Sequence, residues 1–224
     1  MRAIMAIEEY INQEETCWSL GIHNDFLFDN KVRQDFFNTY TDYRICIMDD
    51  KTYDIIPYTF VNKIFIVYST NENYQPKHNK NKDPIVLVHT INEIFEQLHN
   101  YNKNISSKDD SIIVCGGKEI YDLLLPYCEF AYISKNTNRE FYDSNKHIIN
   151  VKNFDKKEDG WKCVTSQIMT DTITNKMISL YRYHNKDMKS FPVKSWIKFL
   201  NKGNILMFHL SFNNIKGNLL DLLM

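Results

Sequence analysis

The chain is poor in glycine, with six in 224 residues, and two of the six are adjacent at Gly116 and Gly117. It also lacks an excess of charge, because 27 lysines and arginines against 28 aspartates and glutamates give a formal net charge of −1. No overall field therefore draws it to nucleic acid or to an anionic membrane. Apolar runs stay far below the ~20 residues of a membrane-spanning helix, and the N-terminus has no signal-peptide pattern. We expect a cytoplasmic protein with neither a membrane nor a nucleic-acid partner.

Cysteine is sparse and unpatterned. The five cysteines are an odd number and contain no CxxC spacing, which favours free thiols in a reducing compartment. Cys46 and Cys115 lie inside apolar runs and are predicted to be core residues. The seven histidines show no ligand spacing, so we assign no metal.

Short apolar runs alternate with helical patterns along most of the chain. The pattern predicts strands at 3–7, 44–48, 64–68, 85–88, 111–115 and 130–133, helices at 29–40, from Ile91 to Leu98 and at 119–125, and a final antiparallel pair at 162–169 and 176–183. Residues 8–17, 71–83 and 100–110 are polar and are interpreted as loops or linkers. Strands that alternate with helices and end in a hairpin predict an α/β sheet that is parallel in its middle.

The last forty residues differ from the rest. Residues 185–224 carry a second apolar set and an alternating run from Leu206 to Phe212. They are consistent with a helix and strand packed on the main domain, with an oligomerisation segment, or with the remnant of a frame change at the end of the gene.

The glycine pair is the most informative local feature. It lies between a β-branched apolar run at 111–115 and a short helical pattern that ends at Pro126. Backbone N–H groups at a strand–glycine–helix junction are free to bind an anion, and glycine lets a ligand approach the backbone closely. The alternative interpretation is a tight turn that needs a positive φ.

These segments together resemble dihydrofolate reductase over residues 1 to about 184. The resemblance rests on the opening strand 3–7, a Trp-x-x-Gly element at 18–21, the helix that bears Phe37, Met48 with Lys51-Thr52-Tyr53, and Gly116-Gly117 with Ile120-Tyr121 and Leu125-Pro126. It implies a three-layer dihydrofolate reductase-like α/β fold, with a mixed, mainly parallel central sheet, flanking helices and a C-terminal antiparallel hairpin. Residues 1–184 would form this domain, and residues 185–224 an extension of unassigned role.

The resemblance also implies a reaction, which is hydride transfer from NADPH to the pterin of 7,8-dihydrofolate, giving tetrahydrofolate for one-carbon metabolism. The dinucleotide carries the hydride and the protein supplies geometry and electrostatics. Cofactor-binding positions would be Ala6, Leu20, Gly21, Lys51, Thr52, Ser69, Thr70, Gly116, Gly117, Lys118, Glu119, Ile120 and Tyr121. Substrate-binding positions would be Ile4, Met5, Arg33, Phe37, Ile56, Phe60, Lys63 and Ser134. We expect a monomer, unless the 185–224 extension mediates oligomerisation.

Two departures from the family pattern bear on the chemistry. The family places a carboxylate four residues before the helix phenylalanine, where this chain has Arg33; Asp29, one helical turn earlier, is the candidate substitute, and Tyr121 completes the catalytic set. The family's Met-Gly-Arg is here Met48-Asp49-Asp50, which places carboxylates near the expected 2′-phosphate and makes NADH an alternative to NADPH. Lys63 stands where the family grips the substrate's α-carboxylate with arginine.

Three functions follow from this pattern. The first is a dihydrofolate reductase whose activity is impaired by Arg33. The second is a catalytically inactive member of the fold that serves in binding. The third is a related NAD(P)H reductase of another heterocycle, such as the pyrimidine reductases of riboflavin synthesis that share this fold.

Overall fold

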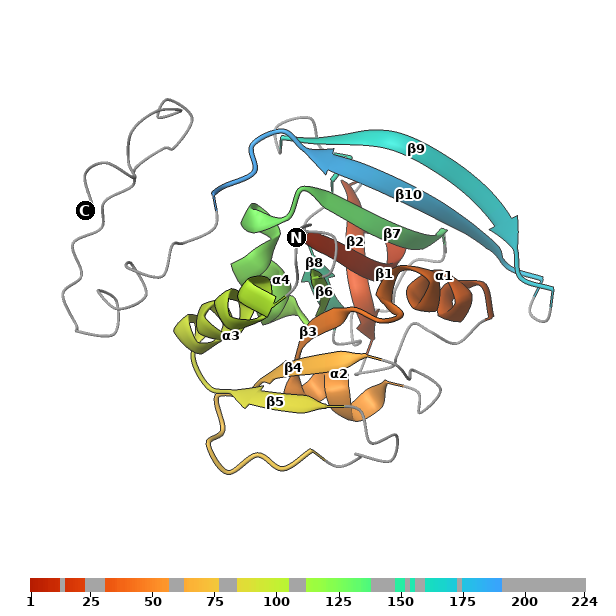
Figure 1. Cartoon of the computed structure of the whole chain (residues 1–224). Coiled ribbons are helices and arrows are strands. Elements are labelled where there is room, and N and C mark those ends of the chain that lie inside the picture. Colours follow the sequence, from red (N-terminus) through yellow and green to blue (C-terminus); the bar gives the residue numbers. More distant parts are fainter. Residues whose placement is uncertain are drawn as a thin grey trace, which may run out of the picture.

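The computed structural model describes residues 1–12, 15–22, 31–56, 63–76, 84–104, 112–137, 148–151, 154–155, 160–172 and 175–190. Within these residues ten strands form one sheet (Figure 1). The strands are β1 (Arg2–Asn12), β2 (Glu15–Ile22), β3 (Ile45–Asp49), β4 (Ile64–Tyr68), β5 (Ile85–Val88), β6 (Ile112–Gly116), β7 (Phe130–Thr137), β8 (Ile148–Val151), β9 (Trp161–Thr170) and β10 (Met177–Asn185). The helices are α1 (Lys31–Thr41), α2 (Asp50–Ile55), α3 (Ile91–Asn104), α4 (Lys118–Leu124) and the 3-10 turn η2 (Leu125–Tyr127).

The middle of the sheet is parallel, as the alternating pattern predicts. The strand order is β5-β4-β3-β6-β1-β7-β10-β9, with β2 paired to β1 and β8. Neighbours from β5 to β7 run parallel, whereas β7–β10 and β10–β9 are antiparallel. The predicted fold class is confirmed, including the closing hairpin.

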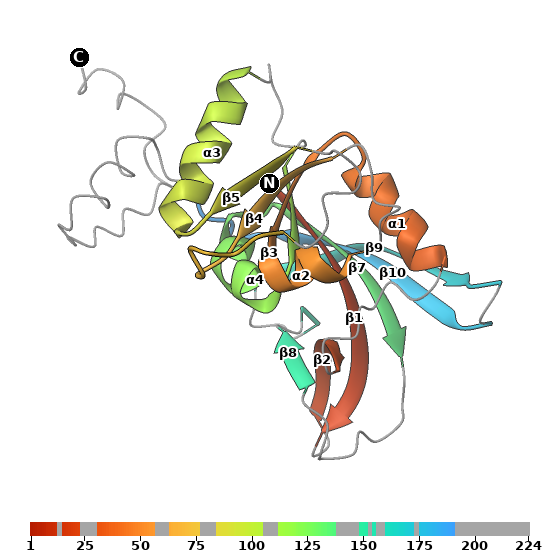
Figure 2. The same cartoon turned by 90° about the horizontal axis from the view of Figure 1, so that it is seen from below.

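Helices cover both faces of the sheet, so the molecule has three layers. Figure 2 shows α1 and α3 on opposite sides of the strands. One apolar cluster joins Phe37 of α1 and Tyr53 of α2 to the sheet. The other joins Ile94 and Leu98 of α3 and Ile120 of α4 to the opposite face. The buried strands place their carboxyl ends along one edge, where ligands of open α/β sheets bind.

The predicted loop at 8–17 is wrong, because most of it is strand. β1 continues to Asn12 and pairs antiparallel with β2, from Glu8 opposite Ser19 to Asn12 opposite Glu15. Polar residues are accommodated here because the carboxylate of Glu9 accepts a hydrogen bond from Lys135 Nζ on β7 at 2.6 Å. A charged side chain inside a strand is tolerated when a partner neutralises it.

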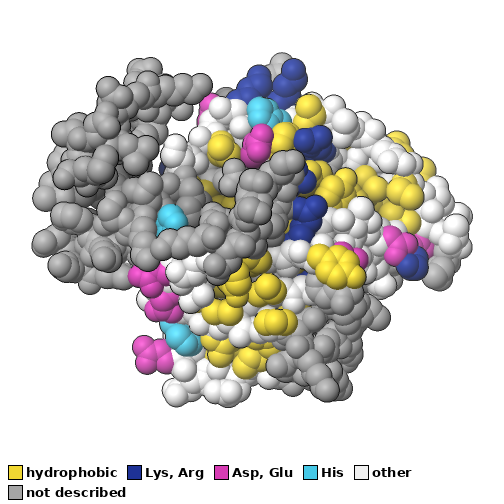
Figure 3. Space-filling model, in the orientation of Figure 1, with side chains coloured by type: hydrophobic (Ala, Val, Ile, Leu, Met, Phe, Trp, Pro, Cys, Tyr) yellow, Lys and Arg dark blue, Asp and Glu magenta, His cyan; other side chains and the backbone are white. Residues whose placement is uncertain are grey.

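Two smaller differences concern α3 and β8. α3 extends to Asn104, into the predicted linker 100–110, and β8 was not anticipated. Beyond its first residue, β9 is exposed along its length, and Figure 3 shows hydrophobic side chains on this hairpin. Ile168 of β9 and Met177 of β10 are both exposed. The segment 191–224 lies outside the described residues. No helix in the described ranges is long and apolar enough to cross a membrane.

Candidate active site

The glycine turn joins β6 to α4 at the centre of the sheet. Gly116 has a φ of 125° and is joined to Gly117 by a cis peptide bond. Side chains rarely adopt that φ, so the first glycine is required by the backbone. The second is required by a close approach: a Cβ on Gly117 would lie 2.5 Å from Asp49 Oδ2 and 3.1 Å from Thr52 Oγ1. The group packed against Gly117 is therefore the side-chain carboxylate of Asp49.

Asp49 connects this turn to the first turn of α2. Its Oδ1 accepts a hydrogen bond from the backbone N–H of Thr52 at 2.8 Å, which is an N-cap. Thr52 was predicted to bind the cofactor, and in this structure its backbone N–H donates to Asp49. A phosphate at that N–H would have to displace the cap.

Asp50 makes a comparable contact at the end of β4. Its Oδ2 accepts a hydrogen bond from Ser69 Oγ at 2.5 Å, and its Oδ1 accepts one from Lys51 N at 2.7 Å. Ser69 is buried, and its carbonyl oxygen lies 2.8 Å from His89 Nδ1. The next residue, Thr70, is exposed.

Tyr121 reaches from α4 to the first strand. Its hydroxyl donates to the carbonyl oxygen of Ile4 at 2.6 Å. Burial, with nearby Cys115, Asp49 and Cys128, raises the pKa of Tyr121 well above its ordinary value. The phenol is thus fixed in its neutral form as a donor to β1.

Ala6 and Ser134 face each other in the β1–β7 register. Ser134 is fully buried, and its hydroxyl donates to the carbonyl oxygen of Met5 at 3.4 Å. Ala6 is also buried.

Arg33 extends from α1 to the middle of β1. The residue is 1% exposed, and its Nη2 donates to the carbonyl oxygen of Ile7 at 2.8 Å. A guanidinium stays protonated in proteins and has no acceptor atom. The position therefore holds a fixed donor with a positive charge, and it cannot give up a proton.

The predicted apolar residues divide between the two faces of the sheet. Ile4, Phe37 and Ile56 belong to one cluster, whereas Met5 belongs to the cluster on the opposite face, against which Leu20 packs. The structure thus brings three of the predicted substrate residues together. Asp29 and Phe60 lie outside the described residues, and Gly21 lies in β2.

Residues 9–183 match the family model whose description is dihydrofolate reductase. The chain belongs to the dihydrofolate reductase family. It is therefore an oxidoreductase by family, with dihydrofolate reduction as the general activity. No curated protein matches the sequence.

Among solved structures, the fold matches dihydrofolate reductase from Enterococcus faecalis complexed with NADP(H) and RAB-propyl. The TM-score is 0.57 at 18% sequence identity, over 83% of this chain and 96% of that one. At this identity the likeness concerns the fold.

Lys63 of this dihydrofolate reductase family member is engaged by α1. The residue is 2% exposed, and its Nζ donates to Asp42 Oδ1 at 2.7 Å and to Asn38 Oδ1 at 3.3 Å. The sequence pattern assigned this ammonium to the substrate's α-carboxylate. A substrate carboxylate would have to share the ammonium with Asp42.

Three of the remaining predicted cofactor residues lie on α4, and one lies on α2. Lys118 is exposed and pairs with Asp122 at 2.6 Å. Glu119 is exposed. Burial is the larger cause of a raised pKa at Tyr68, and the charge of Glu119 adds to it. Ile120 is fully buried and serves the core. Lys51, on α2, is also exposed.

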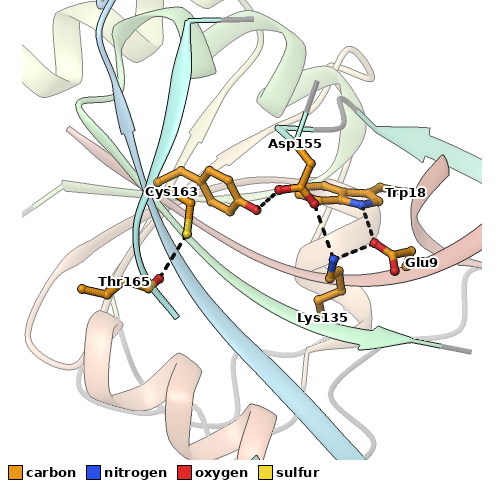
Figure 4. Close-up of polar contacts among 7 residues, drawn as sticks. Glu9, Trp18, Lys135, Asp155, Cys163 and Thr165 are labelled. Carbon is orange, nitrogen blue, oxygen red and sulfur yellow. Dashed lines mark hydrogen bonds and ion pairs between the residues drawn. The ribbon is translucent and has the colours of Figure 1, made fainter. Parts of the chain in front are cut away.

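A partly buried polar cluster links the β1–β2 hairpin to Lys135 of β7 (Figure 4). Lys135 Nζ lies 2.6 Å from Glu9 Oε2 and 3.5 Å from Asp155 Oδ2. Trp18 Nε1 donates to Glu9 Oε2 at 3.2 Å, and the ammonium lies 5.4 Å from the centroid of the Trp18 ring. Trp18, singled out in the sequence as part of a family motif, therefore serves this cluster.

The sequence did not indicate two of the site's internal contacts. The Asp50–Ser69 and Arg33–Ile7 hydrogen bonds join segments 19 and 26 residues apart, and no local pattern reports such pairings. A cleft of about 550 Å³ between α1 and the β9–β10 hairpin contains none of the predicted site residues. Among the described residues no His, Cys, Asp or Glu group is suited to a metal.

Proposed function

We propose that the chain reduces 7,8-dihydrofolate to tetrahydrofolate, with a reduced nicotinamide dinucleotide, NADPH by family precedent, as the hydride donor. The observation that carries the proposal is the family match over residues 9–183. The Enterococcus faecalis dihydrofolate reductase of similar fold is complexed with NADP(H), which supports the cofactor class.

The residues fit the nicotinamide end of such a cofactor better than its phosphates. Ala6 is buried within β1, Tyr121 donates to Ile4 O on the same strand, where the nicotinamide ring would lie, and a neutral phenol does not repel the cofactor. Around the glycine turn, Asp49 already fills the space beside Gly117 and caps α2. The dinucleotide, when bound, supplies the hydride. Gly116, Gly117, Lys51 and Thr52 would hold it near the sheet edge.

Arg33 determines where the proton must come from. Reduction adds a hydride to the pterin carbon and a proton to the adjacent ring nitrogen. The guanidinium at the family's acid position disfavours a protonated pterin, because like charges repel. We assign proton supply to Asp29, directly or through water, and assign to Arg33 the positioning of β1 through Ile7. The expected rate is low, since a positioned acid contributes ~10²–10⁴-fold.

The second candidate is a catalytically inactive member kept for binding. Arg33 favours it, because a buried guanidinium replaces the carboxylate at 1% exposure. The two candidates differ in whether any turnover occurs.

Loss of absorbance at 340 nm with purified full chain, dihydrofolate and either dinucleotide tests the proposal. Consumption that falls at least 100-fold in Asp29→Asn and survives in Arg33→Ala supports a reductase with a relocated acid. No consumption by the native chain, with turnover gained in Arg33→Asp, supports the inactive member. Because Arg33→Asp also removes the donor to Ile7 O, its thermal unfolding is measured in parallel.

A further inference from the structure

The hydroxyl of Ser69, at the C-terminal end of β4, is bound within the chain. Its oxygen donates to Asp50 Oδ2 at 2.5 Å and accepts a hydrogen bond from the backbone N–H of Asn71 at 3.2 Å. The residue is 2% exposed. A hydroxyl has one proton to donate, and the Ser69 hydroxyl donates it in the hydrogen bond to Asp50. A phosphate at this position would have to displace Asp50 to gain that hydrogen bond.

The same end of the sheet carries three carboxylates and one exposed cation, Lys51, in α2 and the residue before it. Asp49 and Asp50 are consecutive at the start of α2, and Asp54 lies one turn later, where it accepts a hydrogen bond from Tyr74 at 2.8 Å. Burial first, then Asp54 and Asp50, raise the pKa of Tyr74. Carboxylates close to a 2′-phosphate repel it and weaken its binding, and salt screens this repulsion. A ribose 2′-hydroxyl is different, since a carboxylate accepts a hydrogen bond from it.

We propose that Asp50 is a cofactor-specificity residue: it accepts a hydrogen bond from a ribose 2′-hydroxyl and disfavours a 2′-phosphate, so that the chain binds NADH at least as tightly as NADPH. The proposal rests on the proposed function, because it presupposes a nicotinamide dinucleotide along the glycine turn and the ends of β4 and α2. It assigns the adenosine end of the site to Asp50 and Ser69 acting together.

The first test measures the dissociation constants of NADH and NADPH for the native full chain by calorimetric titration, at low and high sodium chloride. The expected Kd for NADH is equal to or below that for NADPH. The ratio Kd(NADPH)/Kd(NADH) is expected to fall as salt rises, because screening removes repulsion. A tenfold preference for NADPH that weakens with salt would overturn the proposal, since that is the behaviour of an attractive phosphate site.

The second test uses Asp50→Asn, which keeps an acceptor for Ser69 and removes the charge. NADPH is expected to bind about tenfold more tightly, from the loss of one like charge near a doubly charged phosphate. NADH is expected to bind no more tightly than before. Asp35→Asn is the matched control, because it removes one exposed carboxylate from α1, where Asp35 pairs with Lys31; both affinities should stay within twofold. Equal changes for the two dinucleotides in Asp50→Asn would overturn the assignment.

The outcomes also separate this inference from the proposed function. Binding of both dinucleotides with NADPH tenfold tighter overturns the inference and leaves the proposed function standing. Binding of neither by native chain with an intact circular dichroism spectrum overturns both.

Discussion

Replacing Glu9 by glutamine is expected to destabilise the fold through Lys135. The Glu9 and Lys135 side chains are 19% and 8% exposed, and their charged atoms lie 2.6 Å apart. Loss of one partner from a buried pair costs about 3–5 kcal/mol. Asp155 Oδ2 remains 3.5 Å from the ammonium and Glu9 is partly solvated, so we expect a loss of about 2 kcal/mol, which for a chain of this size lowers Tm by roughly 4–8 °C.

Thermal and urea unfolding, followed by circular dichroism, measure this loss. Asp122→Asn is the control, because it breaks the exposed pair with Lys118 on α4, and exposed pairs contribute about 0–1 kcal/mol. Adding Lys135→Met to Glu9→Gln should recover part of the stability, because the unpaired charge is removed while the stem still packs on Trp18. A Glu9→Gln loss no larger than that of the control would show that the pair does not stabilise the hairpin.

The same pair has a predicted pH dependence. Burial lowers the pKa of Lys135, but the hydrogen bond and charge of Glu9, with Tyr181 and Asp155, outweigh it and raise the pKa above its ordinary 10.5. A raised lysine pKa means that the folded state binds its proton more tightly than the unfolded state. The contribution is therefore complete below about pH 10.5 and is lost as the pH rises through the folded-state value.

Two further predictions concern the glycine turn and the thiols. Gly117→Ala should cost about 1–3 kcal/mol, because the new Cβ would lie 2.5 Å from Asp49 Oδ2; in the Asp49→Ala background, unfolding experiments should show a smaller cost, and equal costs would contradict the contact. Aromatic disulfide reagents should label exposed Cys163 first and half-buried Cys17 more slowly, while three buried thiols should react only on unfolding; early labelling of more than two thiols would contradict the packing. The buried thiols are Cys46, Cys115 and Cys128, and burial raises the pKa of Cys115 and Cys128.

Periodic segments made the fold predictable from the sequence. The runs at 64–68 and 85–88 coincide with β4 and β5, because a parallel strand covered by helices is a continuous apolar run that ends at polar residues. The glycine turn could be located because it lies between the apolar run 111–115 and a helical pattern. The β1–β2 hairpin was not, because Glu9 is acceptable in a strand only beside Lys135, 126 residues away. Local patterns carry no information on such a partner.

The sequence suggested candidate site residues but not the contacts that they make. Family spacing assigned site roles to Arg33, Lys63, Ser69 and Gly117, and these roles stay predictions. It did not indicate that Lys63 is held by Asp42 and Ser69 by Asp50. These contacts depend on which face of a helix packs against which strand end. Tertiary packing decides this, and local sequence patterns do not report it. Roles assigned to Asp29 and Phe60 stay predictions, since both lie outside the described residues.

The transfer of deuterium from a nicotinamide dinucleotide labelled at its hydride position would decide whether this chain is a reductase. The full chain is incubated with 7,8-dihydrofolate and labelled NADH or NADPH, and the products are analysed by mass spectrometry. We expect tetrahydrofolate that carries one deuterium and forms slowly. Unchanged dihydrofolate after prolonged incubation with protein that binds the dinucleotide would contradict the proposed function, and would mean that the chain keeps the fold of a reductase without the reaction.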